Sequence, residues 1–375
     1  MLYVDEIFED YSIRKELVSE PEFIEDIEMS EHDSAFLCGL IKKVHPRKIL
    51  EIGVAGGGTT AIILKCLETI DEPYEMYSVD INSFYYRKPE KNCGYVAEKT
   101  IENIKHGTHT FLFGYGISHH LETIGKDIDF VILDTTHVLP GEILDFLIIY
   151  PYLTKNAVVC LHDIALMQYK NTAEQSYCTA LLLSAVSGKK MINLSSFGDE
   201  EPYYPNIGAF QLTDETRKNM ENLFMALFLR WGYLPSEIEM NKYRECIYRN
   251  YNKQLCMLFE KAVKMNVKNL IRSKFKELSS LPSNSRVVLY GVGCVGKCVL
   301  GLIKYLKNIE FVGCVDKNYK SIGEVDGIEV KSPEGLDVKS FDYLIVATKK
   351  KELVDEIVDY LKKFNMPKER IKIVP

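Results

Sequence analysis

Four side chains able to do chemistry stand at the ends of two apolar runs. DIDFVIL leads into Asp134 and then His137, and AVVCL leads into the pair His162 and Asp163. Each run is typical of a buried strand, and open α/β sheets bind ligands beyond the carboxyl ends of their strands, so we expect the four residues to converge. Two carboxylates and two imidazoles in one site are costly unless a cation or protons balance them. The pattern favours a functional site over its alternative, a capped turn beside a structural pair.

A glycine-rich turn, ILEIGVAGGGTT at 49–60, joins an apolar strand to a helix. Its spacing is Glu51-x-Gly53-x-x-Gly56-Gly57-Gly58, which differs from the G-x-G-x-x-G dinucleotide fingerprint. Glycines let the backbone approach a ligand, and the helix places free N–H groups beside it. The next strand ends MYSVDIN, which puts Asp80 where a carboxylate accepts hydrogen bonds from ribose hydroxyls. The alternative is a tight turn in a domain without a ligand.

These motifs resemble the class I S-adenosylmethionine-dependent methyltransferases, whose first motif is commonly E/D-x-G-x-x-x-G. The resemblance implies S-adenosylmethionine as cofactor, with the glycines making room for its methionine and ribose parts. In the GYGIS stretch at 114–118 many such enzymes have an acidic residue for the adenine amino group, so we expect Tyr115 to stack on the base instead. The implied cofactor-binding residues are Glu51, Gly53, Gly56, Gly57, Gly58, Thr59, Asp80, Gly114, Tyr115 and Asp134.

The two strand-end motifs look like those of a branch of that family, the glycan and natural-product O-methyltransferases related to macrocin O-methyltransferase. There D-G-D-H is followed by a strand ending H-D or D-D, and the acids bind Mg²⁺, which acidifies a substrate hydroxyl. The resemblance implies that Asp134 and Asp163 are metal ligands, with His162 as a third, and an oxygen-rich site suits this hard cation. The second aspartate of D-G-D-H is Thr136 here. We therefore expect His137 to be the catalytic base, because an imidazole can take a hydroxyl proton near neutral pH.

A second glycine-rich turn, YGVGCVGK, follows an apolar strand near the C-terminal end. Gly291, Gly293 and Gly296 match G-x-G-x-x-G, and Asp316 ends the next strand, so the local pattern alone predicts an NAD-type site. The region 285–375 resembles the small Rossmann-like domain of sugar acetyltransferases and sugar C-methyltransferases. That resemblance implies nucleotide-sugar binding at these four residues. The alternative, a domain that has lost its ligand and serves assembly, stays open.

The elements that position these motifs alternate in type along the chain. Helical character is predicted over 1–44. The strands that follow are 48–52, 75–79, 110–113, 130–133 and 157–161, and the helices between them are 59–69, 95–104, 117–124 and 141–150. This alternation predicts an α/β fold with a doubly wound, Rossmann-like parallel sheet covered on both faces.

The first domain is predicted to end with a final strand within 200–212. The aromatic and proline residues of this stretch would line an acceptor pocket or pack in the core. The chain then becomes helical, and a second strand series occupies 286–290, 310–315, 343–347 and 371–374. We therefore expect a methyltransferase domain at 1–213, a helical connector at 214–283 and a smaller Rossmann-like domain at 284–375.

Composition narrows the class of protein. The chain has 375 residues, of which 46% are hydrophobic and 26% charged, as in ordinary globular proteins. A net charge of −7 gives no footprint for nucleic-acid binding, and no apolar run is long enough for a membrane span. Ten scattered cysteines without zinc-type CxxC pairs, and an acidic start without a secretory pattern, predict a cytoplasmic protein.

The sequence thus predicts an S-adenosylmethionine-dependent, Mg²⁺-dependent O-methyltransferase. Its partner is a small molecule, a sugar or sugar-nucleotide acceptor in glycan or glycosylated-metabolite biosynthesis, and a homo-oligomer is compatible with the pattern. Two alternatives remain. One is an NAD(H)-dependent oxidoreductase that uses the C-terminal turn, although no Tyr-x-x-x-Lys pair stands beside it. The other is a non-catalytic nucleotide-sugar-binding or scaffold protein, suggested by Thr136 and Tyr115.

Overall fold

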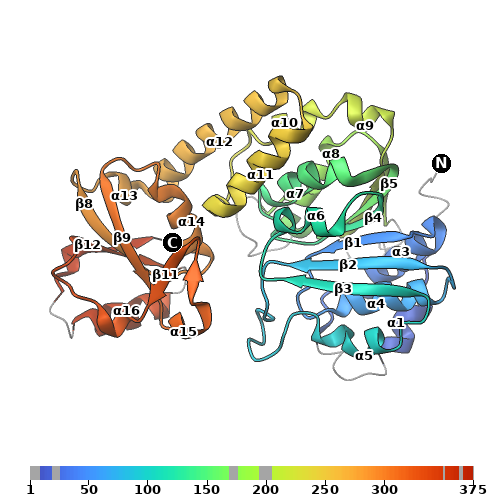
Figure 1. Ribbon diagram of the computed structural model, residues 1–375, viewed down its shortest axis with the longest axis horizontal. Helices are drawn as coiled ribbons and strands as arrows, with labels where there is room; N and C mark the ends of the chain where they lie inside the picture. Colours follow the sequence, from blue (N-terminus) through green and yellow to red (C-terminus); the bar gives the residue numbers. More distant parts are fainter. Residues whose placement is uncertain are drawn as a thin grey trace. The chain divides into compact units, whose positions relative to one another are not determined.

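The computed structural model describes residues 9–18, 26–168, 176–193, 205–348, 351–362 and 366–374. The chain divides into two compact units. Unit 1 comprises Met1–Leu229 and Glu245–Leu258, and unit 2 comprises Arg230–Arg244 and Phe259–Pro375. Figure 1 shows the chain coloured along its sequence, with many of the strands and helices labelled as in the text.

Unit 1 is built on a seven-stranded sheet of order β3-β2-β1-β4-β5-β7-β6. The strands are β1 (Lys48–Ile52), β2 (Tyr74–Asp80), β3 (Gly107–Phe113), β4 (Ile128–Leu133), β5 (Leu153–His162), β6 (Lys189–Ile192) and β7 (Ile207–Gln211). The first five pair in parallel, and β1, β2 and β3 lie side by side in Figure 1. This confirms the predicted α/β fold class with a parallel-dominated sheet.

The far edge of this sheet differs from the sequence-based prediction. β7 runs antiparallel to both β5 and β6, so the sheet is mixed. β7 lies within the stretch predicted to return as a final strand, whereas β6 was not predicted, because its four residues alternate too briefly to stand out. Residues 200–204 of the proposed acceptor-lining stretch lie outside the described residues.

Helices cover both faces of the sheet in unit 1. One core joins Ile49 and Phe130 of the strands to Leu40 and Ile63 of the helices. On the opposite face, the Phe146 ring of α7 meets a strand aromatic edge-on at 5.4 Å. The helices are α1 (Ser12–Leu17), α3 (Glu31–Val44), α4 (Gly58–Glu68), α5 (Glu98–Glu102), α6 (Leu121–Ile124), α7 (Gly141–Ile149), α8 (Cys178–Ala185), α9 (Asp214–Lys218) and α10 (Glu221–Ala226).

The boundaries of α3 follow from its sequence. Ser30 precedes the helix, and its hydroxyl oxygen accepts a hydrogen bond from the backbone N–H of Asp33, so one free donor of the first turn is satisfied. The helix ends at Val44, and His45 adopts a left-handed conformation before Pro46. Asp33, on the capped first turn of α3, is 1% exposed.

Unit 2 contains a six-stranded sheet of order β10-β11-β9-β8-β12-β13. The strands are β8 (Ser285–Tyr290), β9 (Ile309–Val315), β10 (Glu324–Val325), β11 (Ile328–Lys331), β12 (Tyr343–Ala347) and β13 (Ile371–Val374). All pairs are parallel except β10 with β11. The four predicted strands of this region are present, and the β10–β11 hairpin adds an edge that was not predicted.

Helices complete unit 2 and the region before it. They are α11 (Glu237–Asn250), α12 (Lys253–Ser273), α13 (Lys276–Ser279), α14 (Cys294–Ile303), α15 (Tyr319–Ile322) and α16 (Lys351–Lys362). α11 and α12 each contribute residues to both units. Leu344 and Val346 of β12 pack with Ile357 and Leu361 of α16 in the core. None of the helices in the described ranges is both long and apolar enough to cross a membrane.

Candidate active site

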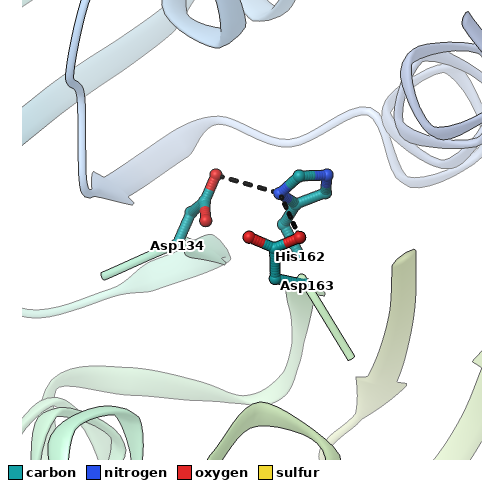
Figure 2. Close-up of side chains that lie close together, drawn as sticks. All are labelled: Asp134, His162 and Asp163. Atoms are coloured by element: carbon teal, nitrogen blue, oxygen red, sulfur yellow. Dashed lines mark ion pairs between the residues drawn. The ribbon is translucent and has the colours of Figure 1, made fainter. Parts of the chain in front are cut away.

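The ends of β4 and β5 bring the strand-end motifs together, as predicted. Asp134 follows the last residue of β4, His162 is the last residue of β5, and Asp163 follows it. The parallel register pairs Leu133 with Leu161, so both strands end at the same edge of the sheet. Figure 2 shows the three side chains lying close together.

Asp134, His162 and Asp163 have the spacing of a metal-binding group. One potential ligand atom from each lies within 4.8 Å of the others. The Nδ1 atom of His162 is 3.2 Å from Asp134 Oδ2 and 3.9 Å from Asp163 Oδ1, the contacts dashed in Figure 2. Within the described ranges this buried nitrogen accepts or donates no hydrogen bond of normal geometry, so it is available to a cation or a proton. The donor set therefore fits a hard or borderline divalent ion.

The charges of Asp134 and His162 shift each other's pKa. Burial by itself would lower the pKa of His162, but the charges of Asp134, Asp33 and Asp163 raise that pKa well above its ordinary value. Burial would likewise raise the pKa of Asp134, and the neighbouring His162 and His137 hold it below its ordinary value. The pair thus exists as an imidazolium and a carboxylate when no metal is bound, because each charged form stabilises the other.

The backbone around Asp163 is fixed by its neighbours. Asp163 has a positive φ of 58°, uncommon for a residue with a side chain. Its carbonyl oxygen accepts a hydrogen bond from Thr179 Oγ1 at 2.9 Å, and its Oδ1 accepts one from Asn206 Nδ2 at 2.7 Å. Elements after β5 therefore hold this carboxylate at the sheet edge.

His137, the predicted base, joins the same group. Its Nε2 is 3.2 Å from Asp163 Oδ2 and 3.6 Å from Asp134 Oδ1. Its backbone also has a positive φ, 58°, and its carbonyl oxygen accepts the N–H of Cys178 at 3.0 Å. Thr136, at the position of the missing second aspartate, is exposed, and its hydroxyl donates to the carbonyl of Val138 at 3.3 Å.

Two buried carboxylates at this site were missed by the sequence analysis. Glu142, in the first turn of α7, is 0% exposed; its Oε1 accepts the His137 N–H at 2.5 Å and lies 3.6 Å from His137 Nδ1. Asp33, on α3, lies with its Oδ2 3.7 Å from His162 Nε2. Glu142 could have been noticed in the sequence because it lies only five residues after His137. Nothing in the sequence links Asp33 to His162, which is far away along the chain.

The glycines of the first turn are required by the packing of the chain on itself. Gly53 has φ 98°, and a Cβ added there would lie 1.7 Å from the carbonyl oxygen of Asp134. Gly57 has φ 94°, and its Cβ would lie 2.7 Å from Gly94 Cα. Gly56 and Gly58 are also buried, and Thr59 follows in the first turn of α4. From the sequence, these glycines were expected to make room for a cofactor; at Gly53 and Gly57 the contact with neighbouring backbone is already sufficient to require glycine.

Two acids flank this turn. Asp80, at the end of β2, accepts the backbone N–H groups of Val54 and Ala55 on its Oδ2, each at 3.0 Å. Glu51 on β1 is fully buried, and its Oε2 accepts the hydroxyl of Thr60 at 2.7 Å. Burial, opposed by hydrogen bonds from Ser78 and Thr60, raises the pKa of Glu51 to about 8.

Gly114 and Tyr115 follow β3 at the same edge of the sheet. Gly114 has φ 92°, and its N–H donates to the carbonyl of Asp80 at 3.0 Å. Tyr115 is 56% exposed, and its ring stacks on His119 with centroids 4.8 Å apart. The predicted adenine-stacking residue is thus accessible, and the predicted cofactor residues all lie at or near the carboxyl ends of β1 to β4.

The second glycine-rich turn, in unit 2, is built like the first. Asp316 Oδ2 accepts the N–H of Val292 at 3.0 Å, as Asp80 does for Val54. Gly291 has φ 92°, a Cβ on Gly296 would lie 2.1 Å from the Gly291 carbonyl oxygen, and a Cβ on Gly293 would meet no atom within 4 Å. The turn therefore has the closely packed third glycine and open second glycine of a dinucleotide-type loop.

Two protein families match the chain, one within unit 1 and one within unit 2. Residues 50–164 match a family described as a methyltransferase domain, and residues 283–372 match a family described as C2185-like, N-terminal. No curated protein matches the chain. The first match confirms the predicted enzyme class, since the matched segment runs from β1 through the His162–Asp163 pair.

Solved structures similar to part of the chain include two O-methyltransferases. The O-methyltransferase TomG from Streptomyces achromogenes, in complex with SAM, is 16% identical over 55% of this chain and 92% of its own, with a TM-score of 0.39. The O-methyltransferase from Bacillus cereus, in complex with SAH, is 16% identical over 54% of this chain and 91% of its own, with a TM-score of 0.37.

Proposed function

From a methyltransferase domain with a polar cluster at its sheet edge, we propose that the protein is an S-adenosylmethionine-dependent, Mg²⁺-dependent O-methyltransferase. The observation that carries the proposal is the convergence of Asp134, His162 and Asp163 beside His137. Transfer of a methyl group to a hydroxyl requires a methyl donor, an acidified hydroxyl and a proton acceptor. The residues at the ends of β1 to β5 supply a place for each.

Asp134, His162 and Asp163 would hold the metal. When bound, Mg²⁺ supplies a positive charge that lowers the pKa of a coordinated hydroxyl. When bound, S-adenosylmethionine supplies the electrophilic methyl group; Asp80 and the N-terminus of α4 lie at the strand ends suited to its ribose and carboxylate groups. Tyr115, exposed at the end of β3, offers a ring face for the adenine.

His137 acts as the base in this proposal. Its Nε2 takes the proton of the acceptor hydroxyl while the oxygen lone pair forms the new bond to the methyl carbon and the sulfur–carbon bond breaks. The Glu142 carboxylate lies 3.6 Å from Nδ1, on the side of the ring away from the proposed metal, so its charge would stabilise the imidazolium that results. Positioning of the two reactants contributes the rest of the rate enhancement.

The acceptor class is proposed as a sugar or sugar nucleotide. Support comes from the D-x-x-H and H-D motifs, which resemble glycan and natural-product O-methyltransferases, and from the second glycine-rich turn around Asp316. We propose that Gly291, Gly293, Gly296 and Asp316 bind the nucleotide part of such a molecule. The geometry of this turn equally supports a second candidate, a nicotinamide dinucleotide at the same place.

Calorimetric titration tests the cofactor. S-adenosylhomocysteine is titrated into the full-length protein with and without MgCl₂, and NAD⁺ is titrated as the comparison. Micromolar binding of S-adenosylhomocysteine that weakens at least tenfold in Asp80→Asn supports the proposal. Binding of NAD⁺ alone would assign the function to unit 2. A thermal melt of Asp80→Asn controls for loosening of the turn, because Asp80 also holds two loop N–H groups.

A pooled set of nucleoside-diphosphate sugars then tests the acceptor. Release of S-adenosylhomocysteine in the presence of the pool, and its loss on chelation of divalent ions, is the expected result. Product formation that is insensitive to chelation would contradict the Mg²⁺ part of the proposal and leave the methyltransferase in place.

A further inference from the structure

The two histidines of the site share one arrangement. Each has one ring nitrogen directed at the Asp134–Asp163 pair and the other directed at a different, buried carboxylate. For His162 the inner nitrogen is Nδ1, 3.2 Å from Asp134, and for His137 it is Nε2, 3.2 Å from Asp163. We call Asp33 and Glu142, which face the other two nitrogens, the outer carboxylates.

The outer carboxylates come from separate helices and are held independently. Asp33 lies in the first turn of α3 and is 1% exposed, and Ser30 Oγ donates to its Oδ2 at 2.6 Å. Glu142 lies in the first turn of α7 and is 0% exposed; Thr135 Oγ1 donates to its Oε1 at 3.0 Å. A buried carboxylate is costly unless hydrogen-bond donors or cations surround it. Asp33 and Glu142 are each placed to accept a hydrogen bond from the ring N–H of a histidine.

The two ring nitrogens that face the outer carboxylates, His162 Nε2 and His137 Nδ1, are buried. His162 Nε2 is 3.7 Å from Asp33 Oδ2, and His137 Nδ1 is 3.6 Å from Glu142 Oε1. Both distances exceed a hydrogen bond, and neither nitrogen has a hydrogen-bond partner within the described part of the chain. A closure of a few tenths of an ångström would complete both contacts.

A cation between Asp134 and Asp163 decides where the ring protons sit. It disfavours a proton on either inner nitrogen, because that nitrogen then faces positive charge. A neutral imidazole carries one proton, so the proton must lie on the outer nitrogen and point at the outer carboxylate. The result is two opposite tautomers, His162 with Nε2–H and His137 with Nδ1–H.

We propose that Asp33 and Glu142 are positioning residues that assign different tasks to the two histidines. Asp33 fixes His162 so that its Nδ1 is a metal ligand, and Glu142 fixes His137 so that its Nε2 accepts the substrate proton. This inference rests on the proposed function. In the transfer step the acceptor hydroxyl proton moves to His137 Nε2, while the Nδ1–H stays on the ring and donates to Glu142.

Nuclear magnetic resonance of histidine side chains tests the assignment. The full-length protein is labelled with ¹⁵N in its eight histidines, saturated with MgCl₂ at mildly alkaline pH, and assigned with His137→Gln and His162→Gln. We expect the two opposite tautomers in the wild type. Glu142→Gln should shift His137 toward a tautomer mixture and leave His162 unchanged, and Asp33→Asn should do the reverse.

Calorimetry with MgCl₂ supplies the second readout. Asp33→Asn should weaken Mg²⁺ binding about 10- to 100-fold, the usual effect of losing a carboxylate behind a ligating histidine. Glu142→Gln should leave that affinity within about twofold, because it acts on the base and not on the ligand set. Glu102→Gln, which removes an exposed carboxylate of α5, is the control and should change neither readout.

The outcomes separate the inference from the function it rests on. A wild type that binds Mg²⁺ but whose tautomers do not respond to either variant would overturn the inference alone. A wild type that binds no Mg²⁺ would overturn both the inference and the metal part of the proposed function. If Glu142→Gln does not fold, Glu142→Asp replaces it, and an unchanged His137 tautomer in that shortened variant would count against the proposal.

Discussion

The carbonyl oxygen of Asp134 occupies the place where a side chain on Gly53 would begin. An added Cβ would lie 1.7 Å from it. This contact joins the end of β1, which carries the glycine-rich turn, to the end of β4, which carries the candidate metal site. The two halves of the predicted chemistry are therefore coupled through backbone atoms.

Gly53→Ala should damage the domain. The substitution combines an unfavourable φ of 98° with a clash against backbone, which cannot move aside as a flexible side chain does. We expect a loss of about 3 kcal/mol or more in the free energy of unfolding, measured by urea denaturation. Gly313→Ala, at a strand glycine whose added Cβ meets nothing within 4 Å, is the control and should stay within about 1 kcal/mol. Equal stability of the two variants would contradict the packing role of Gly53.

Glu51 makes stability fall with rising pH. Its pKa is raised from 4.5 to about 8, so between these values the unfolded chain loses a proton that the folded chain keeps. The contribution is fully present below the unfolded pKa and is lost as pH rises, at about 1.4 kcal/mol per pH unit across that window. Urea denaturation at several pH values should show that Glu51→Gln removes this slope. Substitution of the exposed Glu102 by Gln should leave the slope unchanged. If the slope persists in Glu51→Gln, a titrating group other than Glu51 causes it.

Metal binding should release a proton from His162. Neighbouring carboxylates raise the pKa of His162, so without metal it is protonated at pH values below that raised pKa. A ligating imidazole must be neutral, and therefore the apparent affinity for Mg²⁺ should rise about tenfold per pH unit in this range. Calorimetry in two buffers of different ionisation enthalpy counts the protons released. We expect about one in the wild type and none in His162→Gln; no difference between the two proteins would exclude His162 as the source.

Removal of the proposed base should affect turnover and not cofactor binding. His137→Gln should lower kcat about 10²- to 10⁴-fold on whichever acceptor the pooled sugars identify, with S-adenosylhomocysteine affinity within twofold. Thr136→Ala is the control, because within the described residues that hydroxyl hydrogen-bonds only to the nearby carbonyl of Val138. Turnover by His137→Gln at the wild-type rate would remove His137 from the mechanism.

The sequence predicted the strand ends better than the surroundings of the site. Asp134, His162 and Asp163 converge because parallel strands in register end at one edge, a property that follows from strand order alone. Asp33 was missed because its role depends on how deeply α3 packs, which no local pattern encodes. The short β6 was missed for a similar reason: its pairing with β7 is set by tertiary contacts and not by its own four residues.

The segment that matches a methyltransferase domain runs from residue 50 to residue 164. Asp33 precedes that segment, and Asn206, which hydrogen-bonds to Asp163, follows it. A fragment trimmed to the matched boundaries would keep the three proposed metal ligands and lose Asp33 and Asn206, which lie against two of them. The smallest fragment worth expressing for chemistry is therefore longer than the recognisable domain, and a chimera that exchanges only residues 50–164 would place these ligands in a foreign setting.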